Sequence, residues 1–147
     1  MTSSLSYADD CATCLETHST LRIYPASGDA DLVTALLAIA PTKTQIKSAT
    51  PYRRKPAWFR SSKGLLDSRD TRRHIDWILD RIEPATVALN NLRCAGAKID
   101  IFSYWVSRSG DGGPMLSPSQ LKRLAAMEIE IGWDVYFAGR EKIQPKA

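Results

Sequence analysis

The spacing of apolar residues changes several times along this chain, and each change predicts a switch between strand and helix. In residues 20–24 apolar and polar side chains alternate, which is the period of a strand buried on one face only. A later set recurs at steps of three and four residues, the period of a helix face: Ile75, Ile78, Leu79 and Ile82. Alternation between the two periods favours helices packed against a sheet.

The same reading along the whole chain predicts the element order β-α-β-β-α-α-β-α-β. Strands are expected at residues 12–24, 42–48, 57–61, 97–106 and 129–137. Helices are expected to begin after Asp29, after Ser68 or Asp70, at Ala85 and after Ser117, because capping residues or a proline precede them. Polar residues fill alternate positions of the last strand. We therefore expect a single α+β domain with a mostly antiparallel or mixed sheet and helices mainly on one face.

Local signals fix some boundaries of these helices. Pro41 ends the first helix, and Gly96 follows the third, where a left-handed residue is common. Ser117, Pro118 and Gln120 form a capping box with proline at the first helical position. The expected buried stripe of the first helix consists of five apolar residues: Leu32, Val33, Leu36, Leu37 and Ile39.

Length and composition limit the classes of protein to consider. A chain of 147 residues suits one domain, and a domain of this size buries roughly 70% of its unfolded surface. With 44% hydrophobic residues the chain is not of the disordered class, and its apolar runs are too short to span a bilayer. We expect a domain at residues 11–138, between a flexible N-terminus (1–10) and a flexible tail (139–147). The absence of signal-peptide features and the three cysteines favour a cytoplasmic protein with free thiols.

Two cysteines and a histidine come nearest to a metal or redox motif. Cys11 and Cys14 are spaced as in a CxxC pair, and His18 follows four residues later. Zinc needs a fourth ligand, and redox chemistry favours the pair at a helix N-terminus. Here the pair leads into a predicted strand, where residues three apart point to opposite faces. We therefore expect no metal and no cofactor, and these three residues are the nearest candidates.

The sequence contains no familiar catalytic motif. Residues 107–116 are rich in glycine but lack the Gly-Lys-Ser/Thr ending of a phosphate loop. There is no Gly-x-Ser-x-Gly elbow, and neither His18 nor His74 has a sequence-local triad partner. We nominate no catalytic residue, although a small enzyme whose site forms only on folding stays an alternative.

Charge is distributed very unevenly. Ten of the twenty Lys and Arg residues lie in residues 41–73, where only Asp67 and Asp70 oppose them. Aromatic residues are interleaved, as in surfaces that bind anions. The candidate binding residues are basic and aromatic: Arg53, Arg54, Lys55, Trp58, Arg60, Arg72 and Arg73. The last two lie in a predicted first helical turn, which disfavours cations, so they indicate either an external anionic partner or a tolerated cost.

Two functions and one explanation without a binding role fit this segment. A non-enzymatic interaction domain would use it to meet an acidic protein surface or another anion, and this is the function we expect. A nucleic-acid-binding domain would place the same residues on phosphates, but no known binding signature supports that reading. The segment is also explained by a solvated face that keeps the domain soluble. None of these functions involves a membrane.

A series of short motifs gives the chain a resemblance to a bacterial family catalogued as domain of unknown function 4279. The motifs follow one order over roughly residues 20–137: residues 21–23, 39–42, 58–61, 74–79 with Pro84, 116–117 and 134–136. Where the family pattern has a Lys-Gly pair, this chain has Lys47 and Ser48, so that turn is expected to differ. The resemblance implies an α+β domain and no established reaction.

Overall fold

The computed structural model describes residues 6–47 and 55–138. Its strands are β1 (Cys14–Tyr24), β2 (Lys43–Gln45), β3 (Ala57–Ser61), β4 (Lys98–Ser107) and β5 (Glu130–Phe137). Its helices are α1 (Ala30–Leu37), α2 (Thr71–Ile82), the short 3-10 turn η1 (Glu83–Ala85), α3 (Thr86–Cys94) and α4 (Pro118–Ala126). The predicted order of strands and helices is confirmed, with η1 at the point where Pro84 interrupts the helical pattern.

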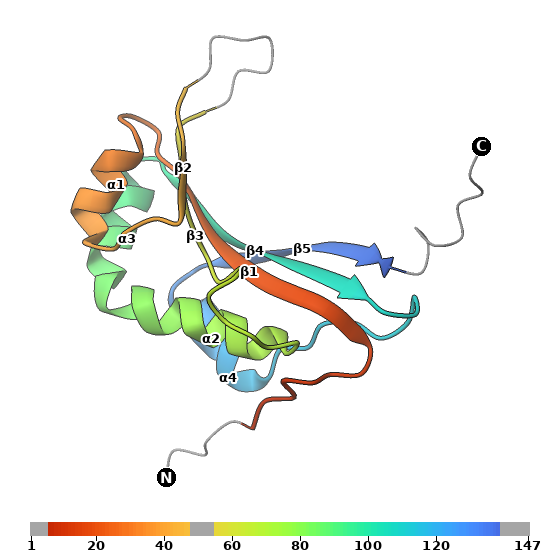
Figure 1. Cartoon of the computed structure of the whole chain (residues 1–147). Coiled ribbons are helices and arrows are strands. Elements are labelled where there is room, and N and C mark those ends of the chain that lie inside the picture. Colours follow the sequence, from red (N-terminus) through yellow and green to blue (C-terminus); the bar gives the residue numbers. More distant parts are fainter. Residues whose placement is uncertain (1–5, 48–54, 139–147) are drawn as a thin grey trace, which may run out of the picture.

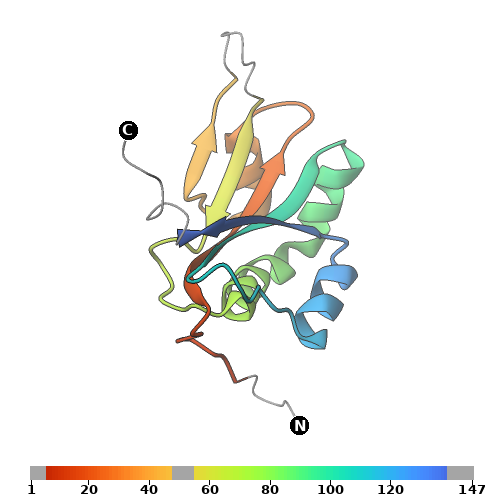
Figure 2. The ribbon, with the colours of Figure 1, turned by 90° about the vertical axis from the view of Figure 1, so that its right-hand side faces the viewer.

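The strands form one five-stranded mixed sheet in the order β2-β3-β1-β4-β5. β1 is antiparallel to both β3 and β4, and β2 is antiparallel to β3. β5 alone among the described strands pairs in parallel, with β4, and the connection between them carries α4. Figures 1 and 2 show the helices gathered on one side of a curved sheet, which confirms the expected α+β arrangement.

The core lies between this sheet and the helices. The predicted helical set on α2 is fully buried, since Ile75, Ile78, Leu79 and Ile82 are each 0% exposed. These side chains pack in one cluster with residues from β1, β3 and β4: Leu21, Ile23, Trp58 and Ile101. Because full burial of one such side chain is worth about 1.5–3 kcal/mol, this layer is the main source of stability.

α1 buries less than the sequence predicted. Its buried residues are Ala30, Val33 and Leu37, which form one stripe along the helix. Leu32 and Leu36 are 42% and 47% exposed, so their assignment to the buried stripe was wrong. The helix spans only eight residues at the periphery of the sheet, and a single narrow stripe meets the core.

The predicted helix starts are confirmed, but α1 ends at Leu37, before Pro41, with Ala38 in the left-handed conformation. Asp29 caps α1, and Asp70, the second of the two expected alternatives, caps α2. At α4 the side chain of Gln120 accepts a hydrogen bond from the backbone N–H of Ser117 at 2.9 Å, which is the returning half of the capping box. Gly96 follows α3 with φ of +97°, a conformation that favours glycine.

A chain of hydrogen bonds between buried polar side chains connects α2 to the middle of the sheet. His74 is 0% exposed, and its Nδ1 lies 2.6 Å from the hydroxyl of Ser62. Ser62 in turn accepts from the backbone N–H of Ser19, whose own hydroxyl lies 2.6 Å from that of Ser103. The other ring nitrogen of His74 meets the carbonyl of Ser68 at 2.8 Å and must donate to it. Both nitrogens are satisfied internally, so His74 is a structural residue of the core.

Candidate functional site

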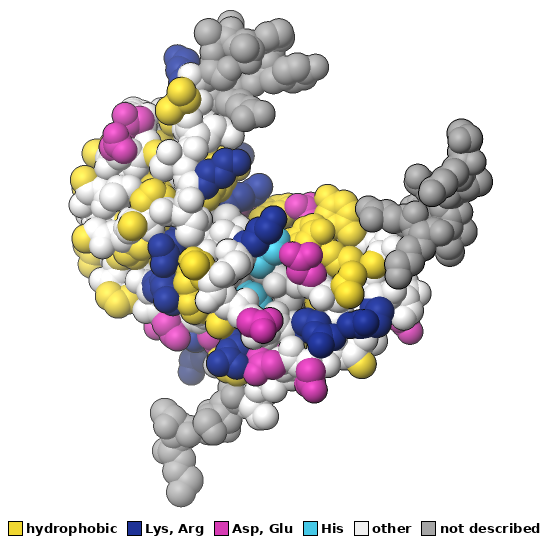
Figure 3. Space-filling model, in the orientation of Figure 1, with side chains coloured by type: hydrophobic (Ala, Val, Ile, Leu, Met, Phe, Trp, Pro, Cys, Tyr) yellow, Lys and Arg dark blue, Asp and Glu magenta, His cyan; other side chains and the backbone are white. Residues whose placement is uncertain are grey.

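The sheet face opposite the helices is left open over the described residues. Alternate residues of β1 from Thr17 to Ile23 are buried under the helices, so the residues between them point outward. The strand registers extend this outward set, which we call the open face: His18, Thr20, Arg22 and Tyr24 of β1, Lys43 and Gln45 of β2, Phe59 and Ser61 of β3, Asp100, Phe102, Tyr104 and Val106 of β4, and Glu130, Gly132, Asp134 and Tyr136 of β5. Figure 3 shows that this side of the molecule is hollowed.

Aromatic rings run across the open face in contact with one another. His18 stacks on Tyr104 with ring centroids 4.8 Å apart, and Tyr104 meets Tyr136 at 5.3 Å. Nearer the other end, Tyr24 meets Phe59 edge-on at 6.1 Å. These contacts fix the rings before any partner arrives, so little side-chain freedom is lost on binding. Tyr136 is the most accessible of them, at 53% exposed.

Arg22 occupies the centre of the open face. Its guanidinium donates two hydrogen bonds to the carboxylate of Asp100, at 2.7 and 2.8 Å, and these raise its pKa. The same group lies 4.1 Å from the ring centroid of Phe102, whose ring rests on Gly132 of the neighbouring strand. Arginine and aromatic residues are both enriched at protein interfaces.

His18 forms one wall of a hollow of about 400 Å³ at one end of the face, together with Lys63 and Arg69 of the loop before α2. Its Nδ1 is buried and has no hydrogen-bond partner in the described part of the chain. Burial and, secondarily, the charge of Lys63 lower the pKa of His18, so the ring is neutral at pH 7. Glu16 and Asp67 also line this hollow, which therefore carries both signs of charge.

Cations predominate around the open face, except along β5 and in the hollow beside His18, where Glu16 and Asp67 also lie. Five cations at its border make no ion pair with another described residue: Lys43, Lys55, Lys63, Arg69 and Lys98. They lie on β2, on the loops before β3 and α2, and at the start of β4. The opposite edge, β5, contributes Glu130 and Asp134 to the face. A partner that covers the whole face must therefore match a basic and an acidic side.

The described candidate residues of the basic segment do not form one surface. Lys55 is exposed, whereas Arg53 and Arg54 lie outside the described residues. Trp58 is 0% exposed and donates from its indole N–H to Thr34 at 3.0 Å, so its assignment as a binding residue is corrected to a core role. Arg60 points to the helix side, where it donates to the carbonyl of Ala40 and stacks over Trp77.

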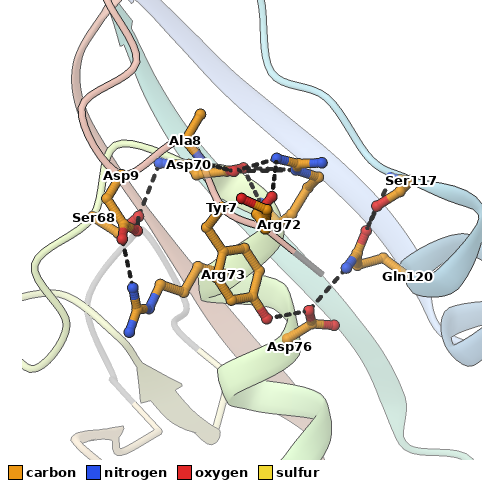
Figure 4. Close-up of polar contacts among 11 residues, drawn as sticks. Tyr7, Ala8, Asp9, Ser68, Asp70, Arg72, Arg73, Asp76, Ser117 and Gln120 are labelled. Carbon is orange, nitrogen blue, oxygen red and sulfur yellow. Dashed lines mark hydrogen bonds and ion pairs between the residues drawn. The ribbon is translucent and has the colours of Figure 1, made fainter. Parts of the chain in front are cut away.

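Arg72 and Arg73 hold the N-terminal segment instead of facing outward (Figure 4). Arg72 binds Asp70 at 2.7 Å and the carbonyl of Ser6 at 3.1 Å, and Arg73 binds Asp9 at 2.6 Å. Because these carboxylates lie at the start of α2, they offset the unfavourable placement of two cations there. The sequence left open an external anionic partner or a tolerated cost for these two arginines; in the structure their anionic partners are Asp70 and Asp9 of the chain itself.

Further hydrogen bonds fasten the same segment, as Figure 4 shows. The hydroxyl of Tyr7 donates to Asp76 at 2.6 Å, and the backbone N–H of Ala8 donates to Asp70 at 2.7 Å. Burial and the bond to Asp76 raise the pKa of Tyr7 to about 12. Residues 7–9, expected within a flexible segment, are therefore attached to α2, whereas the expected tail at 139–147 lies outside the described residues.

The CxxC pair has a different geometry from the expected one. Cys11 precedes β1, and the backbone N–H of Cys14 donates to the carbonyl of Cys11 at 3.3 Å, so the pair closes a turn. Cys14 is 0% exposed, and burial raises the pKa of its thiol to about 11. His18 points to the open face. Within residues 6–47 and 55–138, no cluster of three or more His, Cys, Asp or Glu side chains is arranged to hold a metal ion.

Sequence reasoning missed the aromatic row of the open face. The signal was present, because the polar positions that alternate with the core residues of β1 and β4 carry rings: His18 and Tyr24 on β1, Phe102 and Tyr104 on β4. Their grouping depends on β4 pairing with β1, a long-range contact that no local pattern shows.

Fold and site together define an α+β domain in which, over the described residues, helices cover one face of the sheet and leave the other face open. The chain belongs to the family described as Domain of unknown function (DUF4279), whose pattern matches residues 15–138. No curated protein and no solved structure matches it. In the described part of the chain, no helix has the length and apolar character needed to cross a membrane.

Proposed function

We propose that this chain is a non-enzymatic interaction domain that presents its open face to a partner protein with an acidic surface. The proposal rests on one observation. The hollowed open face, which the described helices leave uncovered, carries Arg22 and aromatic rings that are already held in place by contacts with one another. Tyr, Phe and Arg are enriched at protein interfaces, where they provide most of the binding energy. The unpaired cations at the border supply the attraction for acidic groups.

The division of charge favours a protein over a nucleic acid. A phosphate backbone is uniformly negative, so it would be repelled where Glu130 and Asp134 line the β5 side of the face. A folded protein surface carries acidic groups in one region and basic or neutral groups in another. The expected partner therefore places its acidic groups over the side that contains Lys43 and Lys63.

Crosslinking from the open face tests the location of the interface. A photoreactive phenylalanine analogue replaces Tyr136, 53% exposed on the open face, or Val87, 74% exposed on α3 as the matched control. In the cells that produce the protein, we expect a discrete adduct from position 136 alone. The adduct should be destroyed by protease and resist nuclease. Equal adducts from both positions would remove the open face as the interface, and a nuclease-sensitive adduct would indicate nucleic acid instead.

Charge reversal tests the acidic character of the partner. Lys43→Glu combined with Lys63→Glu changes two exposed side chains without described ion pairs, so the fold should be retained. We expect the adduct from position 136 to fall roughly tenfold, because two rim contacts of about 0.2–1 kcal/mol are replaced by repulsion. Lys122→Glu on α4 is the control and should leave the adduct unchanged. An unaltered yield in the double variant would contradict an acidic partner.

A further inference from the structure

A second hollow lies at the end of the open face where β1 ends and β3 and β4 begin. It has a volume of about 610 Å³ and is lined by seven residues: Tyr24, Pro25, Ala26, Lys55, Pro56, Gly96 and Lys98. Tyr24 and Lys98 are paired across β1 and β4, so the hollow is anchored to the sheet. Its size falls within the range of about 300–1,000 Å³ that small-molecule pockets occupy.

The walls of this hollow are apolar and stiff. Tyr24 is held edge-on against Phe59, with interplanar angle 85°. Pro25 and Pro56 have backbones with fixed φ. Gly96 completes the wall, and a Cβ at that position would lie 3.0 Å from the Cβ of Ala26. Glycine is thus required there by both the close approach and its φ of +97°.

Among the described residues, two cations and no acidic residue line the same hollow. Lys55 and Lys98 are exposed and make no ion pair with a described residue. The hollow beside His18 differs, because acidic side chains line it together with its cations. The hollow at Tyr24 therefore attracts a negative group and offers an apolar surface next to it.

We propose that this hollow binds an apolar monocarboxylate, a ligand with one carboxylate on an aromatic or aliphatic body. The carboxylate lies between the ammonium groups of Lys55 and Lys98, and the body packs on Tyr24 and the two prolines. Two control ligands separate these contributions: inorganic phosphate carries charge but no apolar group, and an aromatic amide carries the apolar group but no charge. A free molecule and the C-terminal residue of a peptide share the required chemistry. The site requires no partner on the open face.

Amide chemical shifts of isotope-labelled protein test the site. The probes are 3-phenylpropionate, 3-phenylpropionamide, inorganic phosphate, and a hexapeptide ending in Phe with a free or amidated C-terminus. We expect 3-phenylpropionate or the free-carboxylate peptide to shift the amides of Tyr24, Gly96 and Lys98, with a Kd on the order of 1 mM for the small ligand. If the peptide binds more tightly, the ligand of the hollow is the C-terminus of a peptide chain. If phenylpropionate binds equally well or more tightly, the ligand is a free small molecule.

Lysine replacements complete the test. Lys55→Gln with Lys98→Gln should weaken carboxylate binding roughly five- to tenfold, since each removes one charge-assisted contact. Lys122→Gln on α4 is the matched control and should change nothing. The proposal is overturned if the carboxylate and amide ligands bind alike, if phosphate binds as well as phenylpropionate, if the double variant binds unchanged, or if no probe shifts these amides at about 10 mM. None of these results depends on the protein partner of the open face.

Discussion

Replacement of Gly132 by alanine is the sharpest test of how the open face is built. The position lies on β5, directly opposite Phe102 of β4. A Cβ added there would lie 2.3 Å from one edge carbon of the Phe102 ring and 2.8 Å from the next. The ring would have to retreat by about 1 Å to reach ordinary contact, and it would then press toward Arg22, whose guanidinium lies 4.1 Å from its centroid.

The magnitude follows from two opposing effects. Overpacking of this kind costs about 1–3 kcal/mol. Loss of glycine also restricts the unfolded chain, which stabilises the protein by about 0.4–1 kcal/mol. We therefore expect Gly132→Ala to lower the free energy of unfolding by roughly 0.5–2 kcal/mol, and Tm by a few degrees.

Urea unfolding followed by tryptophan fluorescence measures this change. Gly113→Ala is the control, since nothing lies within 4 Å of a Cβ there, and it should leave the unfolding midpoint unchanged or slightly higher. The smaller side chain of Phe102→Leu should relieve the crowding, so the double variant should lose at least about 0.5 kcal/mol less than the sum of the single changes. If Gly132→Ala were as stable as the wild type, or if the effects of Gly132→Ala and Phe102→Leu were strictly additive, the close packing of the Phe102 ring on Gly132 would be refuted.

Three further predictions concern stability. Tyr7→Phe removes the bond to Asp76 and should cost about 0.5–1.5 kcal/mol by urea unfolding; no loss would show that the N-terminal segment is not fastened through this hydroxyl. Asp29→Ala removes the cap of α1 and should cost about 1 kcal/mol, whereas Asp29→Asn should restore most of it. Burial lowers the pKa of His74, so the unfolded chain binds more protons below about pH 6.5, and stability should fall from there as the pH decreases. Urea midpoints at about pH 7.5 and 5.5 check this, and a flat profile would contradict it.

Local signals predicted the elements of this fold well because they act within a few residues. Asp70 and the Ser117 box mark helix starts through bonds to the next turn, and the isoleucines of α2 reveal its buried face by their spacing. The stripe of α1 was overestimated, since Leu32 and Leu36 are apolar but have no core beside them. The amount of surface that a short peripheral helix can bury depends on the layer beneath it, which the sequence does not show.

The candidate site was much less predictable than the fold. Candidate binding residues that are near one another in sequence are separated by folding: Trp58 enters the core, Arg60 turns to the helix side, and Arg73 pairs with Asp9. Net charge along the chain is therefore a poor guide to charge on the surface. The open face is instead assembled from residues far apart in sequence, such as Arg22 and Asp100.

The parallel pairing of β5 with β4 has a consequence for the order of folding. A parallel strand needs a crossover connection, here the segment that carries α4. β5 is an edge strand whose neighbour in the described sheet is β4, so we expect it to join the sheet only after β4 has formed. It also leaves the ribosome after all the other described strands. The acidic side of the open face is thus completed last, and a nascent chain displays only the basic side until β5 is in place.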